Sequence, residues 1–103
     1  MRELTFDVTT DKILCIGYKG EDNASKITFE GFEPENETSK VFMKMEGIKD
    51  RISLVDMELV VTNELTKIEG EFEAVLYEQS ADEAFTRLSP TFKLIVEHAL
   101  EVI

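Results

Sequence analysis

Hydrophobic and polar residues alternate along much of the chain, which is the pattern of half-buried β-strands. The longest alternating stretch begins at Ile68. Its even positions are apolar or small and its first odd positions are acidic, namely Ile68, Gly70, Phe72, Ala74 and Leu76 against Glu69, Glu71 and Glu73. One face of this strand is therefore expected to lie on a core and the other to face solvent.

A short helical turn is predicted near residues 62–67, just before the long strand. Thr62 carries a side-chain oxygen that can cap the backbone N–H groups after it, and Leu65 can fold back onto the core. Gly70 permits a bulge or a close backbone approach where the long strand starts. The segment from residue 59 to residue 79 is thus expected to contain two strands joined through a helical turn.

Shorter alternating segments predict further strands upstream. They lie at residues 4–8, 13–18, 27–29, 41–45, 52–54 and 57–59, and turns rich in polar residues or glycine separate them. The segment at residues 13–18 is apolar at both its odd and its even positions, which is typical of a central strand covered on both faces or of a strand at a subunit contact. The first strand is expected to pair directly with it, and residues 31–39 are expected to form a long exposed loop.

The C-terminal segment, residues 89–103, fits two periods. Phe92, Leu94 and Val96 have the spacing of a strand, whereas Ser89-Pro90 and the apolar residues at helical spacing after it suit a helix. The β-forming composition favours a strand at least through Glu97, and strand and helix both stay open for residues 97–103. Turn signals recur about every 8 to 12 residues, as in an all-β sandwich or a small barrel.

The composition narrows the classes of partner. The 103 residues include 22 acids and 11 bases, a net charge of −11, so the chain repels phosphate backbones and anionic lipid. Neither nucleic acid nor membrane is therefore expected as a partner. One cysteine cannot form an intramolecular disulfide, and the sequence shows no signal peptide and no stretch approaching the roughly 18 apolar residues of a membrane span.

Few residues are candidates for catalysis. Cys15 lies in the most apolar predicted strand, where a thiol is expected to be buried and inert. His98 is the only histidine, and nothing in the sequence orients its imidazole toward Cys15, so a catalytic pair is not expected. One cysteine and one histidine are too few ligands for zinc. No catalytic residue, metal ligand or cofactor is assigned.

Acidic loops supply the candidate ligands for calcium. These are Glu21, Asp22, Glu33, Glu35 and Glu37. They lack the Asp-x-Asp-x-Asp spacing that places oxygen atoms around one ion, so solvated loops are the preferred interpretation. No motif marks a pair of carboxylates for glycoside hydrolysis, and no tryptophan is present as a platform for sugar.

Several segments match a known pattern of turns and strands. After an opening pair of strands come Gly20-Glu-Asp-Asn23 with Ile27-Thr-Phe29, then Glu64-Leu-Thr-Lys67 before Gly70 and the strand through Leu76, and finally Ser89 with Phe92, Leu94 and Val96. In these features most of the chain resembles the N-terminal domain of phage upper baseplate proteins, which are tail proteins of phages of Gram-positive bacteria. The matching segments include no catalytic signature.

The resemblance implies an immunoglobulin-like antiparallel β-sandwich, here of about seven to nine strands. The length of the chain leaves room for a single domain over residues 1–103. The resemblance also implies a non-enzymatic structural module that mediates protein–protein assembly at the distal tail. Its partners would be other tail or baseplate proteins and further copies of itself. Its location would be the virion tail, after assembly in the host cytoplasm. Relatives usually continue beyond this domain, and the apolar end at residues 102–103 favours a chain that continues or a terminus that docks.

Three apolar residues are selected as possible contacts with neighbouring subunits, namely Phe32, Phe42 and Tyr77. Two other functions stay open. The first is an immunoglobulin-like module for carbohydrate binding or calcium-dependent adhesion, and the second is a small hydrolase.

Overall fold

The structure is a computed structural model that describes residues 1–100. These residues form nine β-strands and no helix: β1 Arg2–Asp7, β2 Ile13–Tyr18, β3 Ser25–Glu30, β4 Lys40–Met45, β5 Ile52–Ser53, β6 Glu58–Val61, β7 Gly70–Gln79, β8 Thr86–Leu88 and β9 Phe92–Glu97. The all-β prediction is confirmed. Only β8 was not predicted, because its three residues are too few to show an alternating pattern.

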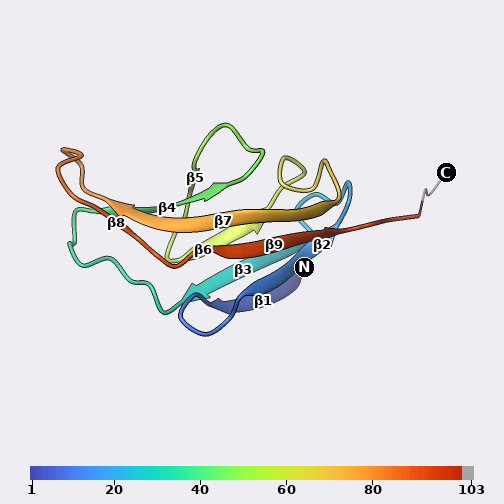
Figure 1. Ribbon diagram of the computed structural model, residues 1–103, viewed down its shortest axis with the longest axis horizontal. Coiled ribbons are helices and arrows are strands. Elements are labelled where there is room, and N and C mark those ends of the chain that lie inside the picture. Colours follow the sequence, from blue (N-terminus) through green and yellow to red (C-terminus); the bar gives the residue numbers. More distant parts are fainter. Residues whose placement is uncertain (101–103) are drawn as a thin grey trace.

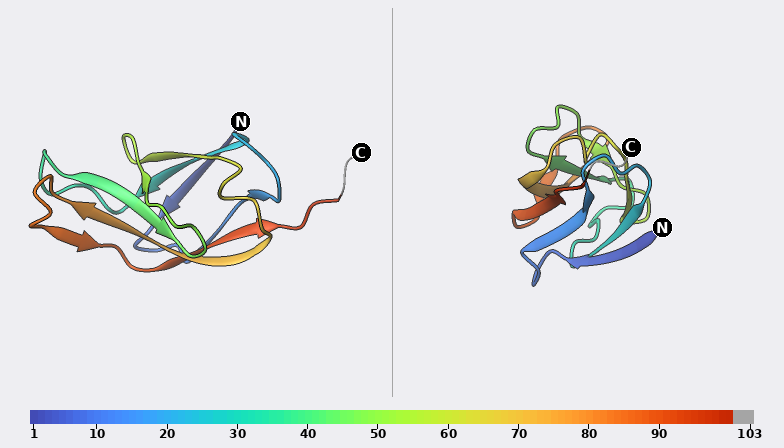
Figure 2. Two further views of the ribbon diagram at one scale, coloured as in Figure 1. Left: turned by 90° about the horizontal axis from the view of Figure 1, so that it is seen from above. Right: turned by 90° about the vertical axis from the view of Figure 1, so that its right-hand side faces the viewer.

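The strands form two sheets that stack as a sandwich (Figures 1 and 2). The smaller sheet has the order β1-β3-β6, and the larger has the order β2-β9-β7-β4-β5, with β8 beside the end of β7. Strand β7 is the central strand of the larger sheet, since its first half pairs with β9 and its second half pairs with β4 and β8. The result is an elongated molecule with principal extents of 49 × 26 × 22 Å.

Two strand pairs are parallel, which the antiparallel expectation did not include. They are β1 with β3 and β2 with β9, whereas the remaining strand pairs are antiparallel. The predicted direct pairing of the first two strands is wrong, because β1 joins the smaller sheet and β2 the larger. The segment between them crosses from one layer to the other. Its corner is tightened by Asp7, whose Oδ1 accepts a hydrogen bond from the backbone N–H of Thr9 at 2.9 Å.

The core lies between the two sheets, as the alternating pattern predicts. Its aromatic centre joins Phe6 and Phe29 of the smaller sheet to Phe92 of the larger, with ring centroids 4.9 to 6.2 Å apart. The even positions of β7 turn inward at Ala74 and Leu76 as expected. Burial of the inward-facing apolar side chains of both sheets supplies the main driving force for folding, at about 25 cal/mol per Å² of apolar surface.

The predicted helical turn at residues 62–67 is wrong. Leu65 N–H donates to the carbonyl of Thr62 at 3.0 Å and Thr66 N–H to that of Asn63 at 3.3 Å, which are the bonds of reverse turns. Thr66 cannot continue a helix because its carbonyl accepts from Gly20 N–H at 2.9 Å and its hydroxyl donates to the carbonyl of Glu21 at 2.6 Å. Leu65 does pack into the core, with 3% of its surface exposed.

The C-terminal stretch can be compared with the prediction as far as residue 100. Strand β9 confirms a strand through Glu97, and residues 98–100 have no regular secondary structure. Residues 101–103 lie outside the described residues, so the choice between strand and helix is not decided for them. Within residues 1–100 the fold contains no helix that is long and apolar enough to cross a membrane.

Candidate interaction site

Two of the three predicted contact residues lie side by side. Phe42 on β4 and Tyr77 on β7 are register partners, and their ring centroids are 5.5 Å apart. Both point to the outer face of the larger sheet, because the alternate positions Met43 and Leu76 are fully buried in the core. The guanidinium of Arg51 lies 3.8 Å from the centroid of the Phe42 ring, which is a cation–π contact, and Phe42 is 8% exposed.

Phe32 lies elsewhere and is covered by its own chain. It belongs to the core cluster with 3% of its surface exposed, because the 31–39 loop folds back onto the sandwich. The guanidinium of Arg87 lies 4.2 Å from the centroid of its ring. Phe32 is therefore a core residue and offers no free surface, whereas contact of Phe42 or Tyr77 with another chain stays a prediction.

The surface around Phe42 and Tyr77 is partly apolar and slightly hollowed. Leu88 on β8 pairs with Tyr77 and is 63% exposed. A hollow of about 460 Å³ lies beside Phe42, and its lining includes Lys40, Arg51 and Gln79. Arg51 Nη1 donates to Gln79 Oε1 at 2.7 Å, which holds the guanidinium over the aromatic ring. This end of the outer face is the candidate interaction site.

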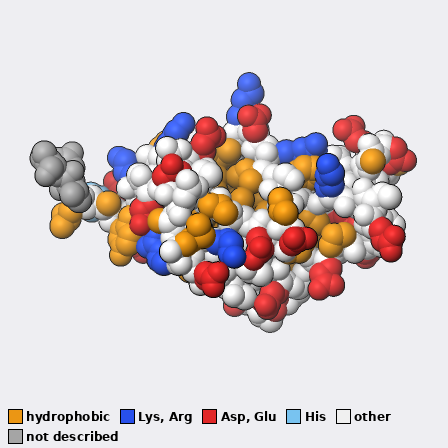
Figure 3. All heavy atoms as spheres, turned by 180° about the vertical axis from the view of Figure 1, so that it is seen from behind, with side chains coloured by type: hydrophobic (Ala, Val, Ile, Leu, Met, Phe, Trp, Pro, Cys, Tyr) orange, Lys and Arg blue, Asp and Glu red, His pale blue; other side chains and the backbone are white. Residues whose placement is uncertain are grey.

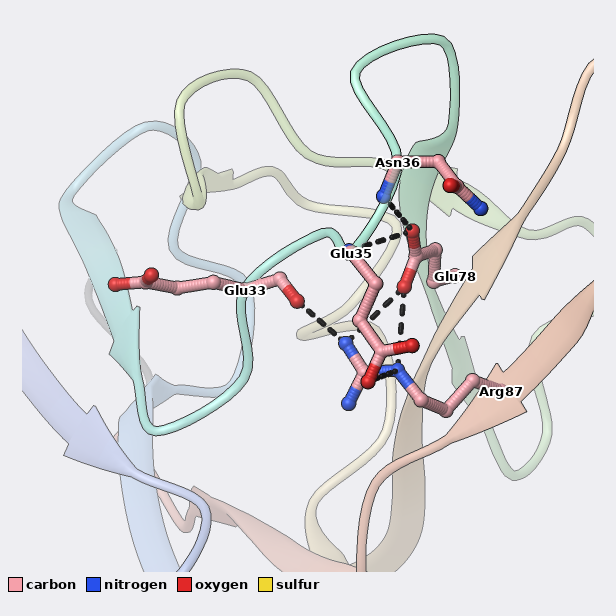
Figure 4. A network of polar contacts seen from close by, with 5 residues as sticks. All are labelled: Glu33, Glu35, Asn36, Glu78 and Arg87. Atoms are coloured by element: carbon pink, nitrogen blue, oxygen red, sulfur yellow. Dashed lines mark hydrogen bonds and ion pairs between the residues drawn. The ribbon is translucent and has the colours of Figure 1, made fainter.

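A buried carboxylate lies beneath the same end of the sheet (Figure 4). Glu78 has none of its surface exposed, and its Oε2 accepts hydrogen bonds from the backbone N–H groups of Glu35 at 2.8 Å and Asn36 at 3.1 Å. Its Oε1 accepts from Arg87 Nε at 3.2 Å and Nη2 at 3.1 Å. Arg87 also donates to the carbonyl of Glu33. Both carboxylate oxygens are thus occupied by the chain itself.

This network fastens the 31–39 loop to β7 and β8. Burial alone would raise the pKa of Glu78, but the hydrogen bonds from Glu35, Asn36 and Arg87 outweigh it and hold the pKa below its usual range. Glu78 was missed from the sequence. A signal was present, because Glu78 continues the even, inward parity of Ala74 and Leu76 on β7.

The structure corrects the expectations for Cys15 and β2. Strand β2 is an edge strand of the larger sheet, so the alternative of a central strand covered on both faces is wrong. Cys15 is exposed there instead of buried, opposite Ile95 on the outer face. His98 contacts Glu69, with Nδ1 2.9 Å from Oε2. The subunit-contact alternative for β2 stays a prediction.

The candidate calcium ligands are engaged separately. Glu21 pairs with Arg2 and accepts from Tyr18 N–H at 2.6 Å, while Asp22 accepts from Asn63 N–H at 2.9 Å. In the 31–39 loop, Glu35 Oε1 lies 3.6 Å from Arg87 Nε, and Glu37 is exposed. The side chain of Glu33 points away from the network around Glu78 in Figure 4. Over residues 1–100, no group of three or more Asp, Glu, His or Cys side chains is placed to hold a metal ion.

The surface charge is spread widely. Acidic side chains lie over the whole face drawn in Figure 3, with Lys, Arg and hydrophobic side chains between them. The net charge of −11 thus comes from many solvated strand and loop positions rather than from an acidic tail.

Comparison with known proteins identifies the fold. No family model matches the sequence, and no curated protein matches it. Among solved structures, the chain is similar to the N-terminal domain of ORF48 of phage TP901-1, with a TM-score of 0.60 and 19% identity. The match covers 93% of this chain and 97% of that chain. The chain has the fold of this phage domain. The resemblance found in the sequence is therefore confirmed at the level of the fold.

Proposed function

We propose that this chain is a non-enzymatic structural domain of a phage tail or baseplate that mediates protein–protein assembly at the distal tail. The observation that supports this most strongly is the similarity to the ORF48 domain, which extends over nearly the full length of both chains. Residues 1–103 would form one domain. Its partners would be other tail proteins and further copies of the chain, assembled in the host cytoplasm and carried in the virion tail.

The candidate site suits assembly better than chemistry. The carboxylate of Glu78 is the most buried ionisable group of the network, and backbone and Arg87 donors occupy its oxygens, so it has no oxygen left for a substrate. The outer face of the larger sheet instead carries exposed apolar side chains, including Leu88 at 63% and Ile13 at 54%. These side chains lie at opposite ends of the face, and exposed apolar residues of this kind are frequent at protein–protein contacts.

The location of the chain in phage particles tests the proposal. Particles from a lysate of the native host would be purified on a density gradient and examined by mass spectrometry and by immunogold labelling with antibodies to this chain. We expect the chain to remain with the particles and the label to lie at the distal end of the tail. Antibodies to the major capsid protein are the control, since they label the head. Recovery of the chain only from the soluble lysate would refute the proposal.

A further inference from the structure

The outer face of the larger sheet is divided by charge along its length. At the end formed by β4 and the second half of β7, register partners place Lys40 beside Gln79, Phe42 beside Tyr77 and Lys44 beside Val75. Partners that lie opposite each other point to the same side of a sheet. We call this end the basic half: Lys40, Phe42, Lys44, Arg51, Val75, Tyr77, Gln79 and Leu88. None of these residues is acidic, and Glu83 of the adjoining loop is the one acid that lines the hollow beside them.

The other end of the same face has the opposite character. Ile16 of β2 is buried, so its alternate neighbours Ile13 and Cys15 point outward, and Tyr18 lies beside Glu97 beyond a bulge. Strand β7 contributes the exposed Glu71 next to Ile95. We call this end the acidic half: Ile13, Cys15, Tyr18, Glu71, Glu73, Lys93, Ile95 and Glu97. It holds three acids and one base, with Ile13 and Tyr18 exposed by 54% and 47%.

We propose that this face docks onto a second copy of the chain. The two-fold axis would lie in the interface, perpendicular to the long axis of the molecule, so that the basic half of each copy covers the acidic half of the other. This inference rests on the proposed assembly function and names the surface for it. In a two-fold interface every contact between two positions occurs twice, so one face with complementary halves is complementary to itself.

The charge balance of the chain supports a second copy as the occupant. A net charge of −11 makes two copies repel at a distance, so association requires cations where they meet. The basic half supplies Lys40 and Arg51, together with Lys44, whose Nζ also donates to the carbonyls of Ile48 and Lys49. The acidic half of the same chain supplies the matching carboxylates. The exposed apolar side chains of both halves would then be covered together, namely Leu88, Ile13 and Tyr18.

Arg51 is the residue best placed to anchor the contact. Its guanidinium is exposed, yet its position is set by the Phe42 ring at 3.8 Å and by Gln79 Oε1 at 2.7 Å. An arginine that is already ordered loses little conformational entropy on binding. Arginine and aromatic residues are also enriched at the centres of interfaces, where a few residues dominate the affinity. Glu71 is its expected partner on the other copy.

Sedimentation equilibrium of the full chain tests the interface by exchanging charges. Wild-type protein is expected to dimerise as its concentration rises from about 5 to 500 μM, the range that reports micromolar to millimolar affinity. Arg51→Glu and Glu71→Lys alone are each expected to weaken the dimer at least about tenfold, because both copies of the contact then hold like charges. An equimolar mixture of the two variants is expected to restore dimers, since each mixed contact again pairs opposite charges.

A charge reversal outside this face provides the matched control. Glu30→Lys changes the net charge by the same amount as Glu71→Lys but lies on β3 in the smaller sheet, so it is expected to leave the dimer intact. Circular dichroism confirms that each variant keeps its β-structure. Each of three results would overturn the inference. The first is a wild-type chain that stays monomeric at every concentration. The others are a mixture that dimerises no more tightly than the single variants, and a Glu30→Lys variant that dimerises as weakly as Glu71→Lys. The immunogold labelling of phage particles would still test the proposed function independently of this dimer.

Discussion

Glu78 shows how one residue ties a long loop to the sheet. A carboxylate without solvent is disfavoured, and it is retained here because two backbone N–H groups and Arg87 replace the lost water. Removing it would leave those two N–H groups without a partner, and Arg87 would keep only Glu33 and Glu35 as polar partners. We expect Glu78→Ala to lower the free energy of unfolding by about 3 kcal/mol, measured by urea denaturation. Glu64→Ala, at an exposed turn position, is the control and is expected to change it by less than about 0.5 kcal/mol.

The same carboxylate predicts how stability depends on pH. The pKa of Glu78 is lower in the folded chain than in the unfolded chain, so its stabilising effect is complete above the unfolded value of about 4.3 and is lost as pH falls through the folded pKa. We expect the wild type to lose stability more steeply than Glu78→Gln as pH falls below about 4.3. Urea denaturation at a series of pH values measures how steeply the free energy of unfolding changes with pH in each protein. Equal slopes for the two proteins would contradict the assignment.

Residues of the candidate site differ in how far the sequence predicts them. Phe42 and Tyr77 lie on the outward parity of their strands, a position that can be recognised from their neighbours in the sequence, and their contact with another chain stays a prediction. Phe32 was selected as a surface contact but is buried, and Arg87 was not singled out from the sequence, since their contact depends on how the 31–39 loop folds back over the sandwich. Strand periodicity carries no information about the path of a loop, and so the network around Glu78 emerged only from the structure.

At the scale of the element, β2 depends on a glycine. Gly17 lies at the register shift of this edge strand with φ +146°, and an added Cβ would lie 2.6 Å from Glu21 Oε1 and 3.2 Å from Arg2 Nη2. Gly17→Ala would therefore disturb the Glu21 carboxylate that binds Arg2 and Tyr18 N–H. We expect a loss of about 2 kcal/mol in the free energy of unfolding, from strain and from this contact.

Gly20→Ala separates the two causes of that loss. Gly20 also has a positive φ, of +88°, but no atom lies within 4 Å of an added Cβ. We expect it to cost about 1 kcal/mol, the backbone term alone. Thermal and urea denaturation of both variants give the comparison, and a Gly17→Ala protein no less stable than Gly20→Ala would show that the close approach of Glu21 is unimportant.

Strand β7 allows a direct test of its alternating pattern. Leu76 has none of its surface exposed, whereas Ile68 shares its parity but lies before the strand and is 67% exposed. We expect Leu76→Ala to cost about 3 kcal/mol in the free energy of unfolding, because it removes buried methyl groups and leaves a cavity. Ile68→Ala is expected to stay within about 0.5 kcal/mol of wild type. Equal losses in urea denaturation would contradict the observed start of the strand.

The pairing of strands was harder to predict than their existence. Alternation is a property of a single strand, so it identified the buried faces of β3, β4, β7 and β9 without indicating their neighbours. The parallel pairs of β1 with β3 and β2 with β9 join segments distant in sequence. Contacts such as Phe6 with Phe92, which cross from one sheet to the other, likewise join segments that no local pattern connects.

At the scale of the whole molecule, the dominant feature is the excess of negative charge. Like charges spread over a compact surface repel one another, and salt screens this repulsion within about 10 Å at 0.1 M ionic strength. The network around Glu78 is partly shielded from solvent and is therefore less affected by salt. We expect the melting temperature to rise by a few degrees when sodium chloride is raised from about 0.02 to 0.3 M.

Divalent cations then distinguish the assembly domain from a calcium-dependent adhesion module. Ions that only screen the surface act through their charge, so calcium and magnesium chloride at equal millimolar concentration are expected to raise the melting temperature equally. A calcium site would stabilise the folded state further, by an amount that grows with the logarithm of the calcium concentration. Since the acidic side chains of residues 1–100 form no cluster suited to a metal ion, we expect the two titrations by differential scanning calorimetry to coincide. A rise specific to calcium would favour the adhesion module instead.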